Sequence, residues 1–408
     1  MKKTTLFLLF LLVGCAASAA DFPVVFTYDT SRPQERFEIQ VPVPDGNYLV
    51  TLEIGSRRFA ARTFVKSESR RLAVNDLSTA KGEVKTVQFL VNKRDKTIRE
   101  AGKDPVQVIT KPREKFKLDW DDCLTLEIAG DAPAVASVRI EPAPADVVTV
   151  FLCGDSTVVD QDIEPWASWG QMFPWFFDTG VAVANYAESG ERADTFIGAG
   201  RLRKILSVLK PGDYVFVEFG HNDMKLKGPG KGGYYFFATQ LKTFADEIRA
   251  KGGIPVFVSP THRRNFDADG HIIETHEDYP EAMEWVARRE GVTFLDLHSQ
   301  TAVFYEAMGE EGSKRAFVHY KAGSFEGMPM DVADNTHFNT YGAFELSKCV
   351  VSLLQVSGLP LARHIVNFTG FSPASPDAPD SFRWPLSPYR DTYGMQVLEK
   401  DDAATVSR

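Results

Sequence analysis

A serine near the middle of the chain stands where a nucleophile is expected. The tetrapeptide Gly154-Asp155-Ser156-Thr157 directly follows a short apolar run. Such a run predicts a buried strand, and in parallel sheets functional sites form at the carboxyl ends of the strands. Gly154 permits a tight turn, after which Ser156 would offer its hydroxyl for attack. Gly, Asp and Ser are also ordinary turn residues, so in isolation a helix N-cap is the competing interpretation.

Two later segments would bring hydrogen-bond donors to the same edge of the sheet. The second apolar run is followed by Gly190, and the third by Gly220-His221-Asn222. Acyl transfer needs two or three donors aimed at one carbonyl oxygen as it becomes negative. The backbone amides of Ser156 and Gly190, with the side-chain nitrogen of Asn222, would form this oxyanion hole. A glycine suits the second position because only its backbone is needed there.

The run Asp334-Asn335-Thr336-His337 precedes the last helical pattern. Within one turn, Asp334 would accept a hydrogen bond from one imidazole nitrogen of His337 and leave the other free to take the proton of Ser156. A lone Asp-x-x-His more often begins a capped helix, which is the competing interpretation. The G-x-S-x-G pattern of the nucleophile-elbow hydrolases is absent at a strand end.

Four motifs in chain order make the pattern specific. Gly154-Asp155-Ser156, Gly190, Gly220-x-Asn222 and Asp334-x-x-His337 resemble the four blocks of the SGNH (GDSL) hydrolases. Within that superfamily the chain is similar to the rhamnogalacturonan acetylesterases over about residues 147–357. The matching runs are Phe151–Thr157, Trp169–Gln171, Gly212–Asp223 and Asp334-x-Thr336-His337 followed by Gly342-Ala343.

The resemblance implies both a fold and a set of roles. The fold would be a flavodoxin-like three-layer α/β/α domain with a parallel sheet. Ser156 would be the nucleophile, His337 its base and Asp334 the residue that orients the base. Ser156, Gly190 and Asn222 would form the oxyanion hole, and no cofactor would be required.

One segment departs from the family pattern. Family members commonly read Gly-Arg-Ser-x-Arg after the second strand, whereas this chain has Gly190-Glu191-Arg192-Ala193-Asp194. If the family's arginines hold an acidic sugar, this chain must hold its sugar differently. Arg263 and Arg264, after the fourth strand, are candidate substrate-binding replacements. Solvated surface charge is the alternative for that pair.

Other residues that can carry chemistry favour structural interpretations. Cys123, Cys153 and Cys349 form no disulfide framework and are interpreted as small apolar residues. Five histidines show no ligand spacing with acidic partners, so we expect no metal site; they are His262, His271, His276, His298 and His319.

The elements that position the motifs follow from hydrophobic periodicity. Helices are clearest at residues 234–250 and 341–356, and in the second Leu346, Val350 and Leu353 fall on one stripe. Alternation of helices with apolar runs predicts a parallel sheet with helices on both sides. The expected strands are residues 147–153, 181–186, 214–219, 254–258 and 293–297.

The chain divides by texture into four parts. Residues 1–20 read as a signal peptide, and residues 21–145 alternate with a period of two, which predicts a smaller all-β sandwich. The sandwich loosely resembles the galactose-binding-like modules appended to carbohydrate enzymes. Residues 146–364 form the predicted SGNH hydrolase domain. Residues 365–408 form an extension rich in Pro, Ser and Asp, whose aromatic residues predict partial packing on the body.

The leader leaves two cleavage interpretations open. Ala17-Ser18-Ala19 suits ordinary signal peptidase, whereas Leu12-Val13-Gly14-Cys15 resembles a lipoprotein box with a lipid anchor on Cys15. Its apolar run is too short to span a membrane. Both interpretations predict export to a bacterial periplasm, to the cell surface or into the medium.

Composition restricts the partners. The chain of 408 residues has 44% hydrophobic residues and a net charge of −9, which disfavours nucleic acid. The expected partner is an acetylated polysaccharide or oligosaccharide, with rhamnogalacturonan as the leading substrate. Xylan, another glycan or a simple lipid ester is the alternative substrate. A non-catalytic glycan-binding lipoprotein is the alternative of another class, which the intact Ser, Asp and His disfavour.

Overall fold

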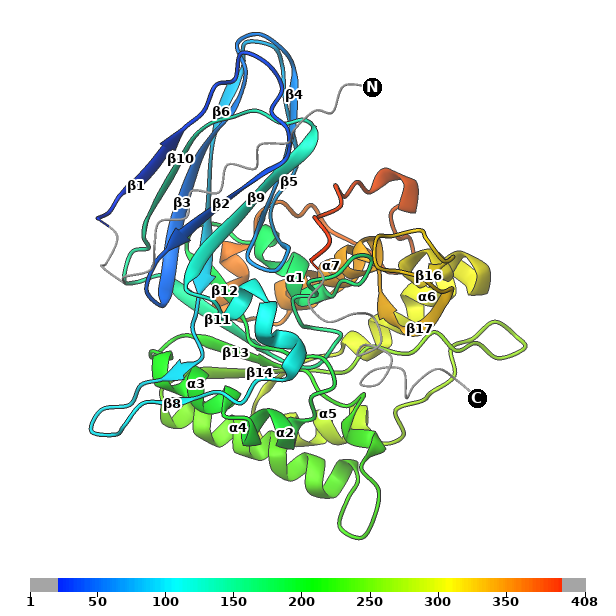
Figure 1. Cartoon of the computed structure of the whole chain (residues 1–408). Coiled ribbons are helices and arrows are strands. Elements are labelled where there is room, and N and C mark those ends of the chain that lie inside the picture. Colours follow the sequence, from blue (N-terminus) through cyan, green and yellow to red (C-terminus); the bar gives the residue numbers. More distant parts are fainter. Residues whose placement is uncertain (1–20, 391–408) are drawn as a thin grey trace.

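A sheet of five parallel strands forms the centre of the C-terminal part of the chain (Figure 1). The structure is a computed structural model and describes residues 21–390. The predicted strands are confirmed, with ends that differ by at most two residues. In spatial order they are β12 (Val181–Asn185), β11 (Val148–Cys153), β13 (Tyr214–Val217), β14 (Ile254–Val258) and β15 (Thr293–Leu295).

Helices cover both faces of this sheet, as the alternating pattern predicts. One face packs against α1 (Trp169–Met172), α6 (Leu297–Ser313) and α7 (Thr340–Val356). The other face packs against α2 (Ala193–Gly198), α3 (Arg201–Val208), α4 (Ala238–Ala250) and α5 (Tyr279–Glu290). In Figure 1, α4 and α5 lie below the sheet, whereas α1 and α7 lie above it.

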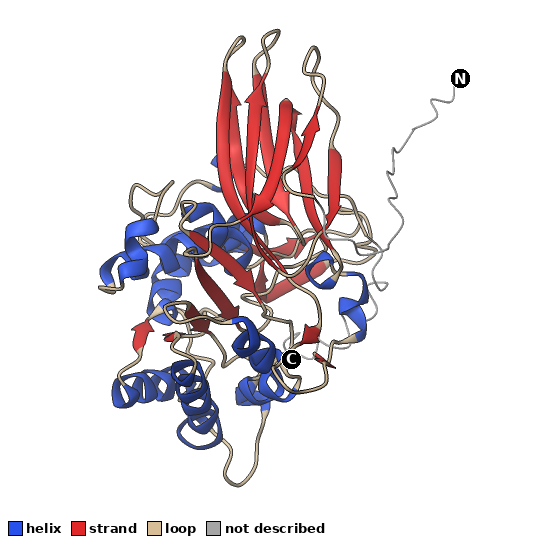
Figure 2. Cartoon of the chain, turned by 90° about the vertical axis from the view of Figure 1, so that its left-hand side faces the viewer, coloured by secondary structure: helices blue, strands red, loops and turns tan. Residues whose placement is uncertain are grey.

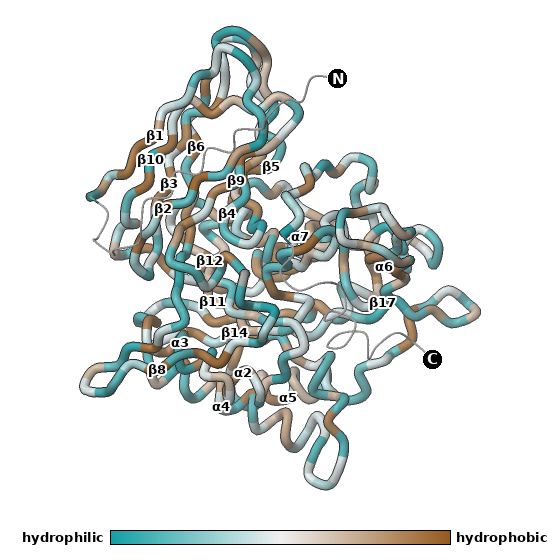
Figure 3. Tube along the Cα trace, in the orientation of Figure 1, coloured by the Kyte–Doolittle hydropathy of each residue, from teal (hydrophilic) through white to brown (hydrophobic). Residues whose placement is uncertain are grey.

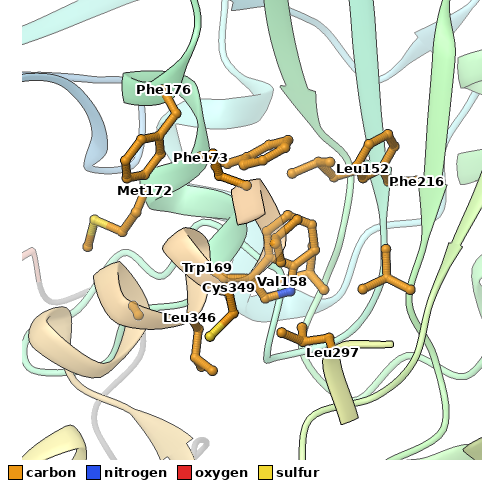
Figure 4. Close-up of a cluster of buried hydrophobic side chains, with 14 of the residues drawn as sticks. Leu152, Val158, Trp169, Met172, Phe173, Phe176, Phe216, Leu297, Leu346 and Cys349 are labelled. Carbon is orange, nitrogen blue, oxygen red and sulfur yellow. The ribbon is translucent and has the colours of Figure 1, made fainter. Parts of the chain in front are cut away.

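Successive strand residues point to opposite helical layers, which is why the strands read as continuous apolar runs. Leu152 and Phe216 pack with Trp169 and Leu346 on the first face (Figure 4). Phe151, next to Leu152, joins the cluster on the second face instead. Each transfer of such a side chain out of water contributes about 1.5–3 kcal/mol, so the two layers together hold the sheet edge in place.

The N-terminal part consists of two four-stranded antiparallel sheets (Figure 2). They lie face to face over one hydrophobic core. Leu124, Leu126 and Ile128 line the inner face of one sheet and are fully buried, as their alternation predicts. The first sheet contains β1 (Val24–Thr27), β10 (Val135–Pro142), β3 (Gly46–Gly55) and β6 (Val84–Lys93). The second contains β2 (Phe37–Pro42), β9 (Cys123–Ala132), β4 (Ala61–Ser67) and β5 (Arg71–Thr79).

Short elements complete the chain. Along the N-terminal strands, polar and apolar residues alternate in Figure 3. The short pairs are β7 (Thr97–Ile98) with β8 (Val106–Gln107), and β16 (Phe317–Tyr320) with β17 (Val332–Phe338). Single helical turns are η1 (Pro112–Phe116), η2 (Leu118–Trp120), η3 (Phe173–Phe176), η4 (Asp223–Lys225), η5 (Gly233–Phe237), η6 (Lys314–Ala316), η7 (Pro360–His364) and η8 (Pro379–Ser381).

The segment after η7 returns along the body. Phe368, Phe382 and Trp384 pack against the first helical layer, and the Lys66 ammonium lies 4.3 Å from the Trp384 ring. The signal peptide, the Cys15 anchor and the end of the extension fall outside the described residues. Between residues 21 and 390, no helix combines the length and hydropathy required to cross a bilayer.

Candidate active site

The turn after β11 places Ser156 at the carboxyl edge of the parallel sheet. The carbonyl of Asp155 accepts hydrogen bonds from the amides of Val158 and Val159, at 3.1 and 3.0 Å. A Cβ on Gly154 would lie only 2.5 Å from the Val158 side chain, so this position requires glycine. The tight turn leaves Ser156 5% exposed at its end.

A buried acidic network supports the turn from below. The Thr157 hydroxyl lies 2.9 Å from Asp155 Oδ1 and 2.8 Å from Glu218 Oε1, and Trp169 Nε1 donates to Glu218 Oε2. Burial, with the nearby Asp155 carboxylate, raises the pKa of Glu218 to about 8. Glu218 is therefore protonated at neutral pH and can donate a hydrogen bond inside this network. No role was predicted for Glu218, although it directly follows β13.

His337 reaches Ser156 from the last strand. Its Nε2 lies 2.8 Å from Ser156 Oγ, and its Nδ1 lies 2.6 Å from Asp334 Oδ2. The predicted convergence of the three side chains is thus present. It joins residues separated by 181 positions in sequence.

The segment Asp334–His337 precedes the last helix, as predicted, but it belongs to a strand. Asp334 and His337 both belong to β17, and helix α7 begins only at Thr340. Val318 pairs with Asp334 and Phe317 with Phe338, so the intervening residues of β17 form a bulge. Within the bulge, the amides of Thr336 and His337 donate to Asp334 Oδ1 at 2.7 and 2.9 Å. The bulge, rather than a helix, therefore folds the carboxylate back onto the imidazole.

The same contacts keep Asp334 ionised. Burial alone would favour its neutral form, but the charge of His337 and three hydrogen bonds hold the pKa of Asp334 below its usual value. An ionised carboxylate on Nδ1 fixes the imidazole tautomer whose Nε2 accepts a proton. The arrangement can therefore take a proton from Ser156. The N-cap of α7 is Asn339 and not a residue of the Asp-x-x-His run, because the Asn339 side chain accepts from the amide of Gly342 at 3.0 Å.

Two of the three predicted oxyanion donors are backbone amides. Those of Ser156 and Gly190 donate to no protein acceptor among residues 21–390. Gly190 has φ of +73°, which favours glycine at this position. The Asn222 Nδ2 atom is engaged, since it donates to the Glu191 carbonyl at 3.1 Å and lies 3.4 Å from Asp155 Oδ2. The second contact is weak enough to be exchanged for another acceptor.

Arg264, a candidate substrate contact in the sequence, is buried and bound to groups of the protein itself. It is 5% exposed, and its guanidinium donates to Ser313 Oγ at 3.0 Å, to Asn335 Oδ1 at 2.9 Å and to the Glu310 carbonyl. Its charge is therefore used to hold Asn335 in the bulge that carries His337. The solvated alternative is wrong, because the side chain is buried.

Arg263 lies closer to the predicted site. It donates to the carbonyl of His221, beside Asn222, at 3.2 Å and to the carbonyl of Thr275 at 3.3 Å. It is 9% exposed, and burial lowers its pKa although nearby carboxylates oppose this. Its role in substrate binding stays a prediction.

The residues at the family's arginine positions contact the protein itself. Glu191 is buried and lies 3.3 Å from Lys111 Nζ and 3.9 Å from Arg201 Nε, and Asp194 pairs with Arg192 at 2.8 Å. The acidic residue after Gly190 is therefore matched by a cation from the N-terminal part. Sequence spacing could not show this pairing.

The hairpin between β4 and β5 contacts the loop that follows Ser156. Arg70 donates to the carbonyls of Gln161 and Trp166 at 3.1 and 2.8 Å. Gln161 in turn donates to the carbonyl of Ser156 at 3.1 Å. Arg71, which belongs to the same hairpin, pairs with Asp160 at 2.5 Å. The N-terminal part therefore positions the nucleophile loop, a contact that the sequence did not predict.

Comparisons with known proteins match mainly the C-terminal part of the chain. The profile of the GDSL-like Lipase/Acylhydrolase family matches residues 134–343. Rhamnogalacturonan acetylesterase RhgT of Bacillus subtilis (strain 168) is 42% identical over 225 residues, which cover 55% of this chain and 96% of the relative. The probable rhamnogalacturonan acetylesterase YesY of the same organism is 32% identical over 220 residues, covering 53% of this chain and 97% of the relative.

A solved structure extends over more of the chain. The crystal structure of protein YxiM from Bacillus subtilis covers 83% of this chain and 85% of its own, with 23% sequence identity and a TM-score of 0.48. The family profile alone spans the segment that contains Ser156, Gly190, Asn222 and His337. The chain therefore belongs to the GDSL-like lipase/acylhydrolase family and is a carboxylic ester hydrolase.

Proposed function

We propose that the chain removes acetyl groups from a pectic polysaccharide, with rhamnogalacturonan as the substrate. The observation that carries the catalytic part is the 2.8 Å contact between His337 Nε2 and Ser156 Oγ, with Asp334 on the opposite ring nitrogen. This is the hydrogen-bonded series that activates a serine for acyl transfer. The similarity to two rhamnogalacturonan acetylesterases supports the substrate.

The geometry supports the following reaction. Ser156 Oγ attacks the acetyl carbonyl while His337 takes the hydroxyl proton. His337 then gives this proton to the departing sugar oxygen, which leaves an acetyl-serine. Water, deprotonated by His337, attacks that ester and releases acetate, and the proton returns to Ser156. Asp334 stays ionised and stabilises the imidazolium that forms in each step.

The oxyanion of each tetrahedral intermediate needs preorganised donors. The amides of Ser156 and Gly190 are proposed to supply two, since neither donates to another protein group in residues 21–390. Asn222 is proposed to supply the third by exchanging its weak contact with Asp155 for the oxyanion. Each donor in such a site contributes about 2.7–4 kcal/mol to the transition state.

One observation favours a second substrate class. The acidic Glu191 and Asp194 stand where the family pattern has arginines, and both already pair with cations of this protein. A neutral acetylated glycan such as xylan is therefore the second candidate. It requires the same Ser156 chemistry and a different sugar contact.

The remaining parts of the chain have proposed roles that fit this activity. The N-terminal sheets are proposed to form a galactose-binding-like accessory domain over residues 21–145 that steadies the hydrolase domain of residues 146–364. Their contact through Arg70 and Gln161 to Ser156 supports a positioning role. Export by the leader would place the enzyme where polysaccharide is met.

Acetate release tests the proposal directly. Wild type should release acetate from acetylated rhamnogalacturonan faster than from acetylated xylan. Ser156→Ala should lower kcat by about 10⁴-fold or more, whereas Ser207→Ala, on the outer helix α3, should leave it unchanged. Faster release from xylan would replace the first substrate with the second. Full activity of the Ser156 variant would remove the catalytic assignment.

A further inference from the structure

Four side chains that can bind a metal ion meet beside the proposed active site. His262 follows β14, Glu274 and His276 lie in the segment before α5, and His298 is in the first turn of α6. One ligand atom from each lies within 4.8 Å of all the others. Sequence spacing did not indicate the cluster, because three separate segments of the chain supply it.

The separations suit a small ion with nitrogen and oxygen ligands. His276 Nδ1 lies 3.6 Å from Glu274 Oε1, and His262 Nε2 lies 4.0 Å from Glu274 Oε2. In tetrahedral zinc sites, bonds of about 2.0–2.1 Å place neighbouring ligand atoms roughly 3.3 Å apart. The 2.6 Å contact between His298 Nε2 and Glu274 Oε2 would have to open by less than about 1 Å.

Two nitrogen atoms of the cluster are buried without a hydrogen-bond partner. They are His262 Nδ1 and His276 Nδ1. The His276 side chain is fully buried, and its Nδ1 faces Glu274. The 3.6 Å between His276 Nδ1 and Glu274 Oε1 is longer than a hydrogen bond, and an ion between these atoms would bind both.

Outer contacts already orient two of the rings. His298 Nδ1 donates to the carbonyl of Pro260 at 2.7 Å, which leaves Nε2, now 2.6 Å from Glu274 Oε2, as the nitrogen that would lose its proton and bind the ion. His276 Nε2 lies 3.0 Å from His221 Nδ1, and His221 Nε2 lies 3.1 Å from Thr261 Oγ1. Such hydrogen bonds from the non-ligating nitrogen are the usual support of histidine ligands.

The charge and access of the cluster also suit a cation. One carboxylate faces three imidazole rings here, and the four ligand atoms lie within 4.8 Å of one another. The Glu274 side chain is 41% exposed and provides both a negative charge and a route from solvent.

We propose that His262, Glu274, His276 and His298 bind one Zn²⁺ ion. Three imidazoles and one carboxylate match the ligand preference of zinc, whereas calcium and magnesium prefer all-oxygen sites. All four positions of a tetrahedral ion are filled by protein, so the ion is structural and takes no part in ester hydrolysis. It joins the loop after β14, the segment before α5 and the start of α6.

The proposed ion is connected to the oxyanion residue Asn222 through His276 and His221. His276 contacts His221, whose carbonyl accepts from Arg263, and Arg263 also holds the carbonyl of Thr275. Zinc binding would therefore steady the loop that ends in Asn222. Loss of zinc is expected to lower thermal stability first and kcat secondarily.

The test uses the full chain, stripped with a strong chelator and then titrated with Zn²⁺, Ca²⁺ or Co²⁺. One equivalent of Zn²⁺ should bind and raise Tm, and Co²⁺ should give the visible absorption of a tetrahedral site. Ca²⁺ should have no effect. His298→Gln and Glu274→Gln should each weaken Zn²⁺ binding by about tenfold or more.

Matched controls separate this site from other binding. His271→Gln changes an exposed imidazole of the same segment that lies outside the cluster, and it should retain wild-type affinity. Ser156→Ala should also retain full zinc affinity, so failure of the proposed hydrolysis would not affect this result. The proposal is overturned if the stripped protein binds no Zn²⁺ at about 1 mM, or if both ligand variants bind it as wild type does. Glu274→Gln covers the case in which His298→Gln does not fold, since Glu274 lies at the surface.

Discussion

The N-terminal antiparallel sheets and the C-terminal parallel sheet contribute different things to one site. Every side chain of the proposed Ser156–His337–Asp334 series comes from the C-terminal part. The N-terminal part instead inserts Arg70 and Arg71 beneath the loop that follows Ser156. Leu72 of the same hairpin belongs to the hydrophobic core of the C-terminal part. The catalytic side chains and the arginines that support their loop therefore come from two different parts of the chain, which share an interface.

The two regions also differ in how charge is buried. At the catalytic edge, ionised Asp334 has its charge matched by a neighbouring imidazole that must change protonation during turnover. At the interface, Arg71 lies 2.5 Å from Asp160 and 2.7 Å from Asp119, and it is 2% exposed. Arg71 takes no part in the proposed proton transfers. Substitutions in the first region should therefore affect rate, and those in the second should affect stability.

The largest expected effect is on rate. His337→Ala removes the general base and should lower kcat on 4-nitrophenyl acetate by about 10⁴-fold or more. Its unfolding midpoint in urea should stay close to that of wild type, because the side chain makes its main contacts to Ser156 and Asp334. His271→Gln, an exposed imidazole, serves as the control. Retention of activity would show that His337 is not the general base.

The next effect is on stability. Arg71→Ala removes the buried cation nearest to Asp119 and Asp160, although Arg94 stays 4.0 Å from Asp119, and should reduce the free energy of unfolding by about 3–5 kcal/mol. Arg139→Ala removes an exposed pair with Glu141 and should change it by at most about 0.5 kcal/mol. Urea denaturation followed by tryptophan fluorescence measures both. Equal stability of the two variants would show that the interface does not join the regions.

A smaller, pH-dependent effect should arise under the nucleophile. The folded-state pKa of Glu218, about 8, exceeds its ordinary value of 4.5. The folded protein therefore binds more protons than the unfolded chain between these values, and the free energy of unfolding falls as pH rises through this window. Each pH unit accounts for about 1.4 kcal/mol at most for one group.

Glu218→Gln mimics the protonated acid and should flatten this dependence. Some slope should remain, because burial also raises the pKa of Asp223 to about 7. Urea midpoints at several pH values between 5 and 8 (roughly one unit apart) give the slope for both proteins. A variant with the same slope as wild type would mean that Glu218 is ionised in the folded state.

Much of the fold followed from local sequence. The strand Ile254–Val258 was predicted without error, because a run of apolar residues between glycine and proline signals has few other structures available. The helix expected over residues 234–250 is also present, although its first turn, Gly233–Phe237, is a wider π-helical turn. Local periodicity carries this information because it reflects which face is buried.

The sequence predicted which catalytic residues meet better than it predicted the backbone that brings them together. Asp334 and His337 meet as expected, but through a bulge in β17 whose register depends on pairing with β16. Arg264 was misplaced because its partners, Ser313 and Asn335, are distant in sequence. The histidine cluster was missed for the same reason. Contacts between distant loops leave no periodic signal in a single sequence.

The most direct measurement is the site of covalent modification by a fluorophosphonate, which forms a stable adduct with an activated serine hydroxyl. We expect one adduct per chain, located on Ser156 by peptide mass spectrometry, with acetate release lost in proportion. Labelling should disappear in His337→Ala. An adduct on another residue that abolishes activity, or full activity of protein labelled on Ser156, would contradict the assignment of Ser156 as the nucleophile.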